Sequence, residues 1–368
     1  MASATDRGNV AEGLEGVVVA ATRLSDVDGE AGRLVIAGRD VERLAKDGDF
    51  ESAVRALWSA GGIAVPDAGK LQAELGAARV RAFESLSRFR GALEADGGMD
   101  ALRGAVAQLP DSSTEVTVTA AVAVFAAAWW RSKSKQALVA PDPSKSHAAD
   151  YLRMVTGHAP SAIDARGMGA YLCTVSDHGM NASTFAARVV ASTGSDLVSS
   201  VVAAIGALKG PLHGGAPGPV LDMLDAIGTP DGATAWIENE LASGRRIMGM
   251  GHRVYRVRDP RAAVLEASVM GLREAGANTP RLELARAVEA AAFGVLAKKY
   301  PARTLAANVE FYTAVLLDAL GIDRQLFTPT FAVGRVAGWC AHVAEQRARG
   351  RLIRPQSIYV GEAPGESS

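Results

Sequence analysis

The run VTVTAAVAVFAAAWW (116–130) constrains the fold more than any other stretch of this chain. It is apolar all round the helix that it would form, which is typical of a helix enclosed by other protein. It is too short to span a bilayer, which takes about 20 apolar residues, and its alanines favour close helix packing. The sequence therefore predicts a large helical core built around this segment.

Helical periodicity fills most of the rest of the chain after Asp49, with apolar residues at every third or fourth position. Asp49 is the predicted N-cap of a helix that begins at residue 50. A second helix is expected from residue 66 to about Leu75, followed by another. Either Asn181 or Ser183 caps the helix that carries Phe185. The expected architecture is mainly α-helical.

Only Thr22 to Ile36 alternates as strands do, and Asp28-Gly29 is a plausible hairpin turn within it. Cys173 and Cys340 lie in apolar surroundings, so two buried thiols are expected rather than a disulfide. The first residues lack the pattern of a targeting signal. We therefore expect a cytoplasmic protein without a membrane segment.

The net charge of −1 provides no broad basic surface for nucleic acid. Arginine is nevertheless concentrated in the stretch from Gly210 to Arg261. This stretch begins GPLHGGAPGPVLDML and ends MGMGHRVYRVRDPRA, and each end presents one histidine among glycines, His213 and His252. Glycine permits close backbone approach to a ligand, and histidine suits proton chemistry near neutral pH. The pattern favours a small anionic ligand.

These two segments resemble signature motifs of citrate synthases. DHGMNASTFAARVVAST (177–193), NVEFYTAVLLDALGI (308–322), FAVGRVAGWCAHVAEQ (331–346) and IRPQSIYVG (353–361) extend the resemblance in the family's order over nearly the whole chain. The resemblance implies a mainly helical, two-domain homodimer. It places a discontinuous large domain at 1–214 and 326–368 and a small domain at 215–325.

The resemblance also implies acyl transfer from acetyl-CoA to oxaloacetate through an enolate, giving citrate and CoA. His213 is implied as the donor to the enolate oxygen and His252 as the donor to the oxaloacetate carbonyl. Oxaloacetate is implied to contact the following residues: His178, Arg261, Arg335 and Arg354. Arg354 is expected to reach the partner subunit's site. Guanidinium groups suit this diacid because each grips a carboxylate through two hydrogen bonds.

Coenzyme A is the other expected ligand, and its thioester is a substrate, so neither a cofactor nor a metal is expected. Arg256 matches a family position that contacts its phosphates, and Arg253, Arg258 and Arg303 are weaker candidates. The backbone of Met248, Gly249, Met250 and Gly251 is expected to lie against the CoA, because glycines permit close contact.

One residue departs from the family pattern: the catalytic aspartate is replaced by Glu310, in NVEFYTA. Both side chains are carboxylates of similar intrinsic pKa, but the extra methylene moves the oxygens by roughly 1–1.5 Å, which can cost about a hundredfold in rate. Glu310 is thus either the base on a displaced backbone, the base of a weak or specialised synthase, or the mark of a non-catalytic CoA- or dicarboxylate-binding relative. The other alternative is 2-methylcitrate synthase using propionyl-CoA, since one methylene is worth only about 1–3 kcal/mol in a pocket.

Overall fold

The computed structural model describes residues 10–214, 217–252 and 254–361. Most of them are helical, as predicted. The first eight α-helices are α1 (Val41–Ala45), α2 (Phe50–Ala60), α3 (Ala68–Glu84), α4 (Arg90–Leu93), α5 (Gly98–Val106), α6 (Glu115–Lys133), α7 (His147–Thr156) and α8 (Ala162–Val175). The next eight are α9 (Ala182–Ser192), α10 (Leu197–Leu208), α11 (Pro217–Ile227), α12 (Ala233–Ala242), α13 (Pro260–Glu274), α14 (Pro280–Lys299), α15 (Val309–Ala319) and α16 (Phe327–Arg349). Short 3-10 helices are η1 (Glu12–Leu14), η2 (Leu86–Phe89), η3 (Pro230–Gly232) and η4 (Arg324–Leu326).

The strands form one small antiparallel sheet, β1 (Ser25–Asp28), β2 (Arg33–Ile36) and β3 (Arg39–Asp40), in the order β1-β2-β3. Asp28 pairs with Arg33, so the hairpin connection spans residues 29–32 and begins at Gly29, directly after Asp28, as predicted. The two-residue strand β3 was not predicted, because it pairs through its backbone and both of its side chains are exposed.

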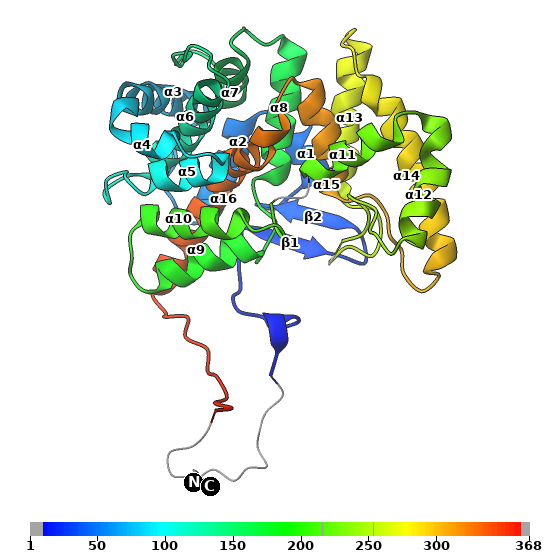
Figure 1. The fold of residues 1–368 in the computed structure, drawn as a ribbon. Helices are drawn as coiled ribbons and strands as arrows, with labels where there is room; N and C mark the ends of the chain where they lie inside the picture. Colours follow the sequence, from blue (N-terminus) through cyan, green and yellow to red (C-terminus); the bar gives the residue numbers. More distant parts are fainter. Residues whose placement is uncertain (1–9, 215–216, 253, 362–368) are drawn as a thin grey trace, which may run out of the picture.

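Two helices are buried along most of their length. α6 contains the predicted apolar run, and nearly all its residues from Val118 to Trp129 are buried. α16 packs against α2, α5, α6, α8, α9 and α10. In Figure 1 α16 runs through the middle of the group that contains α2 to α10, while α11 to α15 lie together on the other side. The division into domains at 215 and 325 stays a prediction.

The two helix caps predicted from the sequence are both present. Asp49 accepts a hydrogen bond from the Ser52 amide at the start of α2. The helix predicted to end near Leu75 is in fact α3, which continues to Glu84. Asn181 caps α9 by accepting from the Thr184 amide, which resolves the choice between Asn181 and Ser183.

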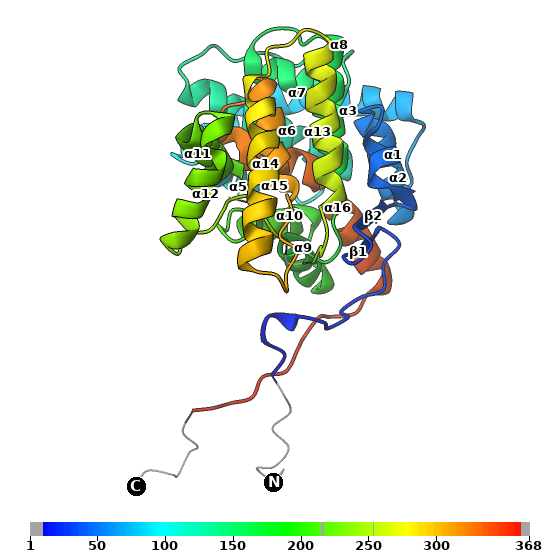
Figure 2. The same ribbon diagram turned by 90° about the vertical axis from the view of Figure 1, so that its right-hand side faces the viewer.

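The chain ends leave the body of the molecule on the same side. Residues 350–361 follow α16 without regular structure, and Figures 1 and 2 both show this segment and the one before β1 running away from the helices. Cys173 and Cys340 are buried free thiols, as predicted. No helix among the described residues is long and apolar enough to cross a membrane.

Close approach of α16 to the end of α8 depends on Gly338. A Cβ atom at this position would lie 2.1 Å from the Ser176 carbonyl oxygen and 3.1 Å from Asp177 Oδ1. Because Ser176 and Asp177 directly precede His178, this contact also fixes the turn that carries a predicted substrate contact. Helix packing and the site are therefore coupled at this glycine.

We predict that Gly338→Ala destabilises the protein by about 1–3 kcal/mol, because overpacking forces backbone to move. Gly294→Ala is the matched control: it lies inside α14 with no atom within 4 Å of its added Cβ. That substitution should stabilise by up to about 1 kcal/mol through helix propensity. Urea unfolding measures the free energy of unfolding of both variants. Equal values would show that α16 can shift to accommodate the added methyl group without loss of stability.

Candidate active site

The loop before His252 is fixed against the segment that leads into α15. The Gly251 amide donates to the Ala306 carbonyl, and the Asn308 amide donates to the Gly249 carbonyl. Gly249 and Gly251 have φ of 73° and 84°, a region that side chains disfavour. At Gly249 a Cβ would also lie 2.8 Å from the Phe311 ring. The glycines therefore bring His252 close to the helix that carries Glu310.

Asp259 joins two of the predicted site elements. Its carboxylate accepts two hydrogen bonds from the Arg261 guanidinium, at 3.0 and 2.8 Å, and one from the Val309 amide at the start of α15, at 3.1 Å. Asp259 and Arg261 are both buried. One carboxylate thus fixes the Arg261 side chain relative to the helix of Glu310. Asp259 has no function predicted from the sequence, although it lies in the same DPRA segment as Arg261.

Glu310 lies in the first turn of α15, where its amide donates to the Asn308 side chain. Its Oε2 atom is buried and has no hydrogen-bond partner among the described residues. Burial, reinforced by the negative charge of Asp259, raises the pKa of Glu310 to about 7, although Arg261 and Arg335 act in the opposite direction. A carboxyl group with such a pKa exchanges protons near neutral pH, as a general base must.

His213 follows α10 and is held by a buried serine. Its Nε2 atom lies 2.8 Å from Ser183 Oγ, which also accepts from Trp339 Nε1 and lies 2.8 Å from Asn181 Oδ1. Burial, together with the nearby Arg335 charge, lowers the pKa of His213 to about 4. The imidazole is therefore neutral at physiological pH. Ser183 is a site residue that sequence analysis considered only as a helix cap.

His178 and His252 face each other. Their ring centroids are 5.6 Å apart, and His178 Nε2 lies 3.2 Å from the Tyr255 hydroxyl. Burial, with the Arg261 charge, lowers the pKa of His252 to about 4 and that of His178 well below its ordinary value. His252 Nδ1 accepts from the amides of Val254 and Tyr255. The neutral ring therefore carries its proton on Nε2.

Arg335 is a buried cation without a carboxylate partner in the part of the chain that the structure describes. It is 1% exposed, its Nε donates to the Val175 carbonyl, and its guanidinium lies 4.7 Å from the centroid of the Phe331 ring. Burial lowers its pKa to about 10. A buried charge is costly unless it is paired, so this site is suited to an anion.

A buried charge network supports the turn before His178. His342 Nε2 lies 3.1 Å from Asp177 Oδ1, and its Nδ1 atom lies 2.9 Å from Arg188, which pairs with Glu345 at 2.7 Å. His342 is thus a packed, hydrogen-bonded histidine. The network links α9 to α16 directly behind the site.

Several predicted CoA contacts lie at the surface. Met248 and Arg256 are exposed, Gly249, Met250 and Gly251 are half-exposed, and Arg256 Nε lies 3.9 Å from Glu30. Arg303 is also exposed, whereas Arg253 lies outside the described residues. These positions leave the CoA assignments as predictions.

Arg354 lies apart from the other candidates within this chain. It is exposed, in the segment that Figure 1 shows leaving the body after α16.

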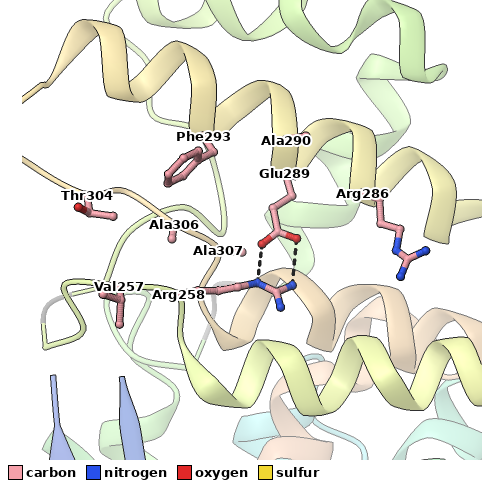
Figure 3. Close-up of a pocket in the computed structure, with 9 residues that line it drawn as sticks. All are labelled: Val257, Arg258, Arg286, Glu289, Ala290, Phe293, Thr304, Ala306 and Ala307. Carbon is pink, nitrogen blue, oxygen red and sulfur yellow. Dashed lines mark hydrogen bonds and ion pairs between the residues drawn. The ribbon is translucent and has the colours of Figure 1, made fainter. Parts of the chain in front are cut away.

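The Arg258 guanidinium is already paired with two carboxylates. Glu266 and Glu289 accept its hydrogen bonds at the edge of a cavity of about 480 Å³ (Figure 3). No group of three or more His, Cys, Asp or Glu side chains in the described part of the chain is arranged to hold a metal.

The fold and the site together define a mainly helical protein with a site for proton transfer on an anionic substrate. This site contains buried arginines, neutral imidazoles and a carboxyl group whose pKa is about 7. The family model for the citrate synthase C-terminal domain matches residues 13–356. Citrate synthase of Haloferax volcanii is 40% identical, with 96% of this chain and 97% of the relative covered. That of Deinococcus radiodurans is 37% identical, with 96% of each covered. This chain belongs to the citrate synthase family.

Solved structures agree over the whole length. Citrate synthase of Thermotoga maritima superposes with a TM-score of 0.85 at 33% identity, with 98% of each chain covered. The citrate synthase of Thermoplasma acidophilum gives a TM-score of 0.85 at 26% identity, with 98% of each chain covered, and that structure is a ternary complex with carboxymethyl coenzyme A and oxaloacetate. The mainly helical citrate synthase fold expected from the resemblance is thus confirmed.

We predict that ionisation of Glu310 lowers stability as pH rises. Its pKa in the folded protein, about 7, is above the ordinary 4.5, so the native state holds the proton more tightly between these values. Glu310→Gln cannot ionise, and its stability relative to the wild type should therefore increase from pH 5 to pH 8 by up to about 3 kcal/mol. Urea unfolding at both pH values measures this, and parallel pH profiles would contradict the raised pKa.

Proposed function

We propose that the protein condenses acetyl-CoA with oxaloacetate to give citrate and CoA. The observation that carries this proposal is Arg335, which is buried and forms no ion pair among the described residues, although the charges of Asp177, Arg261 and Glu310 all act on it. An incoming diacid supplies the missing negative charge. The relatives named citrate synthase, and the carboxymethyl coenzyme A and oxaloacetate held in the Thermoplasma complex, support the same reaction.

Oxaloacetate binds through Arg261, Arg335 and neutral His178 in this proposal. His252 Nε2 and the Arg261 guanidinium are 3.4 Å apart. Since Nδ1 of His252 already accepts from two amides, Nε2 is a donor, and so is the guanidinium. Two donors that face each other are both satisfied by one acceptor oxygen. The ketone oxygen of the diacid is suited to this position, which polarises the carbonyl and later lets His252 protonate the alkoxide.

Glu310 then takes a proton from the thioester methyl group, and His213 donates to the developing enolate oxygen. His213 needs its proton on Nδ1 for this purpose, so substrate binding turns the one Ser183 hydroxyl proton, which in the structure donates to Asn181 Oδ1, toward His213 Nε2. The enolate carbon attacks the ketone carbon, and hydrolysis of the resulting thioester releases CoA. Coenzyme A enters as a substrate, and the proposed steps need no further cofactor.

The test is CoA release from acetyl-CoA plus oxaloacetate by the purified protein, with propionyl-CoA in parallel. We predict that His213→Ala lowers kcat by about 10²–10³, because one donor to the enolate oxygen is lost. A thiol reagent measures the released CoA. Unchanged turnover in the variant would exclude His213 from the mechanism. Calorimetry that detects binding of both substrates to the wild type, without thiol release, would indicate a non-catalytic relative.

We also propose a homodimer in which Arg354 completes the partner's site. Apolar residues at the surface of α9 and α10 are half-exposed and provide a contact face: Phe185, Val189, Val190, Val202 and Ala203. The segment after α16 exposes the apolar side chains of Leu352, Ile358 and Val360, and contact with a partner subunit would bury them. The protein is further proposed to work in the cytoplasm, which suits its buried free thiols.

Mixing two inactive variants tests the shared site. Arg354→Gln and His213→Ala should each be nearly inactive alone. After subunit exchange, about a quarter of wild-type activity should return, because half of the dimers are mixed and each contains one complete site. Exchange itself is followed by mass spectrometry of the intact dimers. Mixed dimers without recovered activity would show that Arg354 acts within its own chain.

A further inference from the structure

Arg258 lies at the centre of a charge cluster that joins three helices. Its guanidinium donates to Glu289 of α14 at 2.7 and 3.0 Å and to Glu266 of α13 at 2.8 Å. Arg286 adds a second cation by donating to Glu266 at 2.8 Å. The two cations and two anions balance, so the cluster offers no excess positive charge to a phosphate. Figure 3 shows the Arg258–Glu289 pair at the cavity between α14 and the segments around Val257 and Ala306.

The same cluster reaches α15, the helix of Glu310. The Tyr312 hydroxyl donates to Glu289 Oε2 at 2.7 Å, and the Arg258 guanidinium lies 5.3 Å from the centroid of the Tyr312 ring. Asp259, the next residue along the chain, accepts from the Val309 amide. Two neighbouring residues of opposite charge thus hold α15 at two points.

These two points hold α15 in different ways. Val309 is held through its backbone N–H, which points along the helix axis at the N-terminal end, and Tyr312 is held three residues further on through its side chain. Glu310 lies between them in sequence and about 100° round the helix from Val309. The Val309 bond and the Asn308 cap hold the N-terminal end of α15, whereas the Tyr312 hydroxyl adds a contact on the side of the helix that opposes rotation about its axis. The position of the Glu310 carboxyl group therefore depends on both.

We propose that Arg258 is a positioning residue that fixes the orientation of Glu310 through Glu289 and Tyr312, and that it is not a ligand of the CoA phosphates. This inference rests on the proposed function for its kinetic consequence. The long side chain of Glu310 makes the constraint important, because a shift of about 1 Å at a catalytic group can cost about a hundredfold in rate.

Kinetics distinguish a positioning function of Arg258 from binding of the CoA phosphates. Arg258→Gln and Glu289→Gln should each lower kcat at least about tenfold through misplacement of Glu310, with KM for acetyl-CoA within about twofold of wild type. Tyr312→Phe keeps the ring but loses one hydrogen bond, so its effect should be smaller and in the same direction. Arg286→Gln removes a cation from the same cluster without a contact to Tyr312, and it should leave kcat within about twofold.

The contrary results are equally specific. A rise in KM for acetyl-CoA at constant kcat in Arg258→Gln, with no effect of Glu289→Gln, would identify Arg258 as a phosphate ligand and overturn the proposal. Unchanged kinetics in both variants would overturn it as well.

A readout without turnover separates this inference from the proposed function. Hydrogen exchange at the amides of Val309 to Tyr312 should be at least about tenfold faster in Arg258→Gln and Tyr312→Phe than in Arg286→Gln, since local opening of α15 becomes easier. Wild-type protein that releases no CoA would contradict the proposed function, but the exchange rates would still test whether Arg258 holds α15 through Glu289 and Tyr312. Equal exchange rates in all three variants would overturn this positioning function of Arg258.

Discussion

The carboxylate of Asp259 is the constraint on which the site depends. Two of its hydrogen bonds hold Arg261 and a third holds the start of α15, so one side chain links the cation proposed to bind substrate to the helix of the proposed base. Its charge also acts on both neighbours: it raises the pKa of Glu310 and, against the effect of burial, that of Arg261. Geometry and proton affinity are thus set by the same group.

The electrostatics of the site follow from burying two guanidinium groups near three imidazoles. Burial and these cations lower the pKa values of His178, His213 and His252, so all three are neutral donors or acceptors near pH 7. A neutral imidazole still has one N–H group and can donate a hydrogen bond to a substrate oxygen through it. The cost of burying Arg335 is offset when an anion arrives, which couples substrate binding to the stability of the site.

Local chemistry allowed much of the fold to be predicted from sequence. The apolar run of α6 and the Asp49 cap of α2 depend on residues within a few positions of each other. The contacts of Ser183 and Arg258 depend on residues far along the chain, Trp339 and Glu289, and a sequence pattern does not pair such residues. Asn181 and Ser183 were equally good candidates for the cap of α9. Capping preference alone therefore could not show that Ser183 is instead the residue that contacts His213.

The Glu310 carboxyl group has a pKa of about 7 in the unliganded protein, so it is close to half-protonated in neutral solution. A bound diacid would neutralise Arg261 and Arg335, the two cations that hold this pKa down, and Glu310 would then gain a fraction of a proton from the buffer. The heat of diacid binding would accordingly depend on the ionisation enthalpy of that buffer, which makes proton uptake a calorimetric signature of this unusual glutamate.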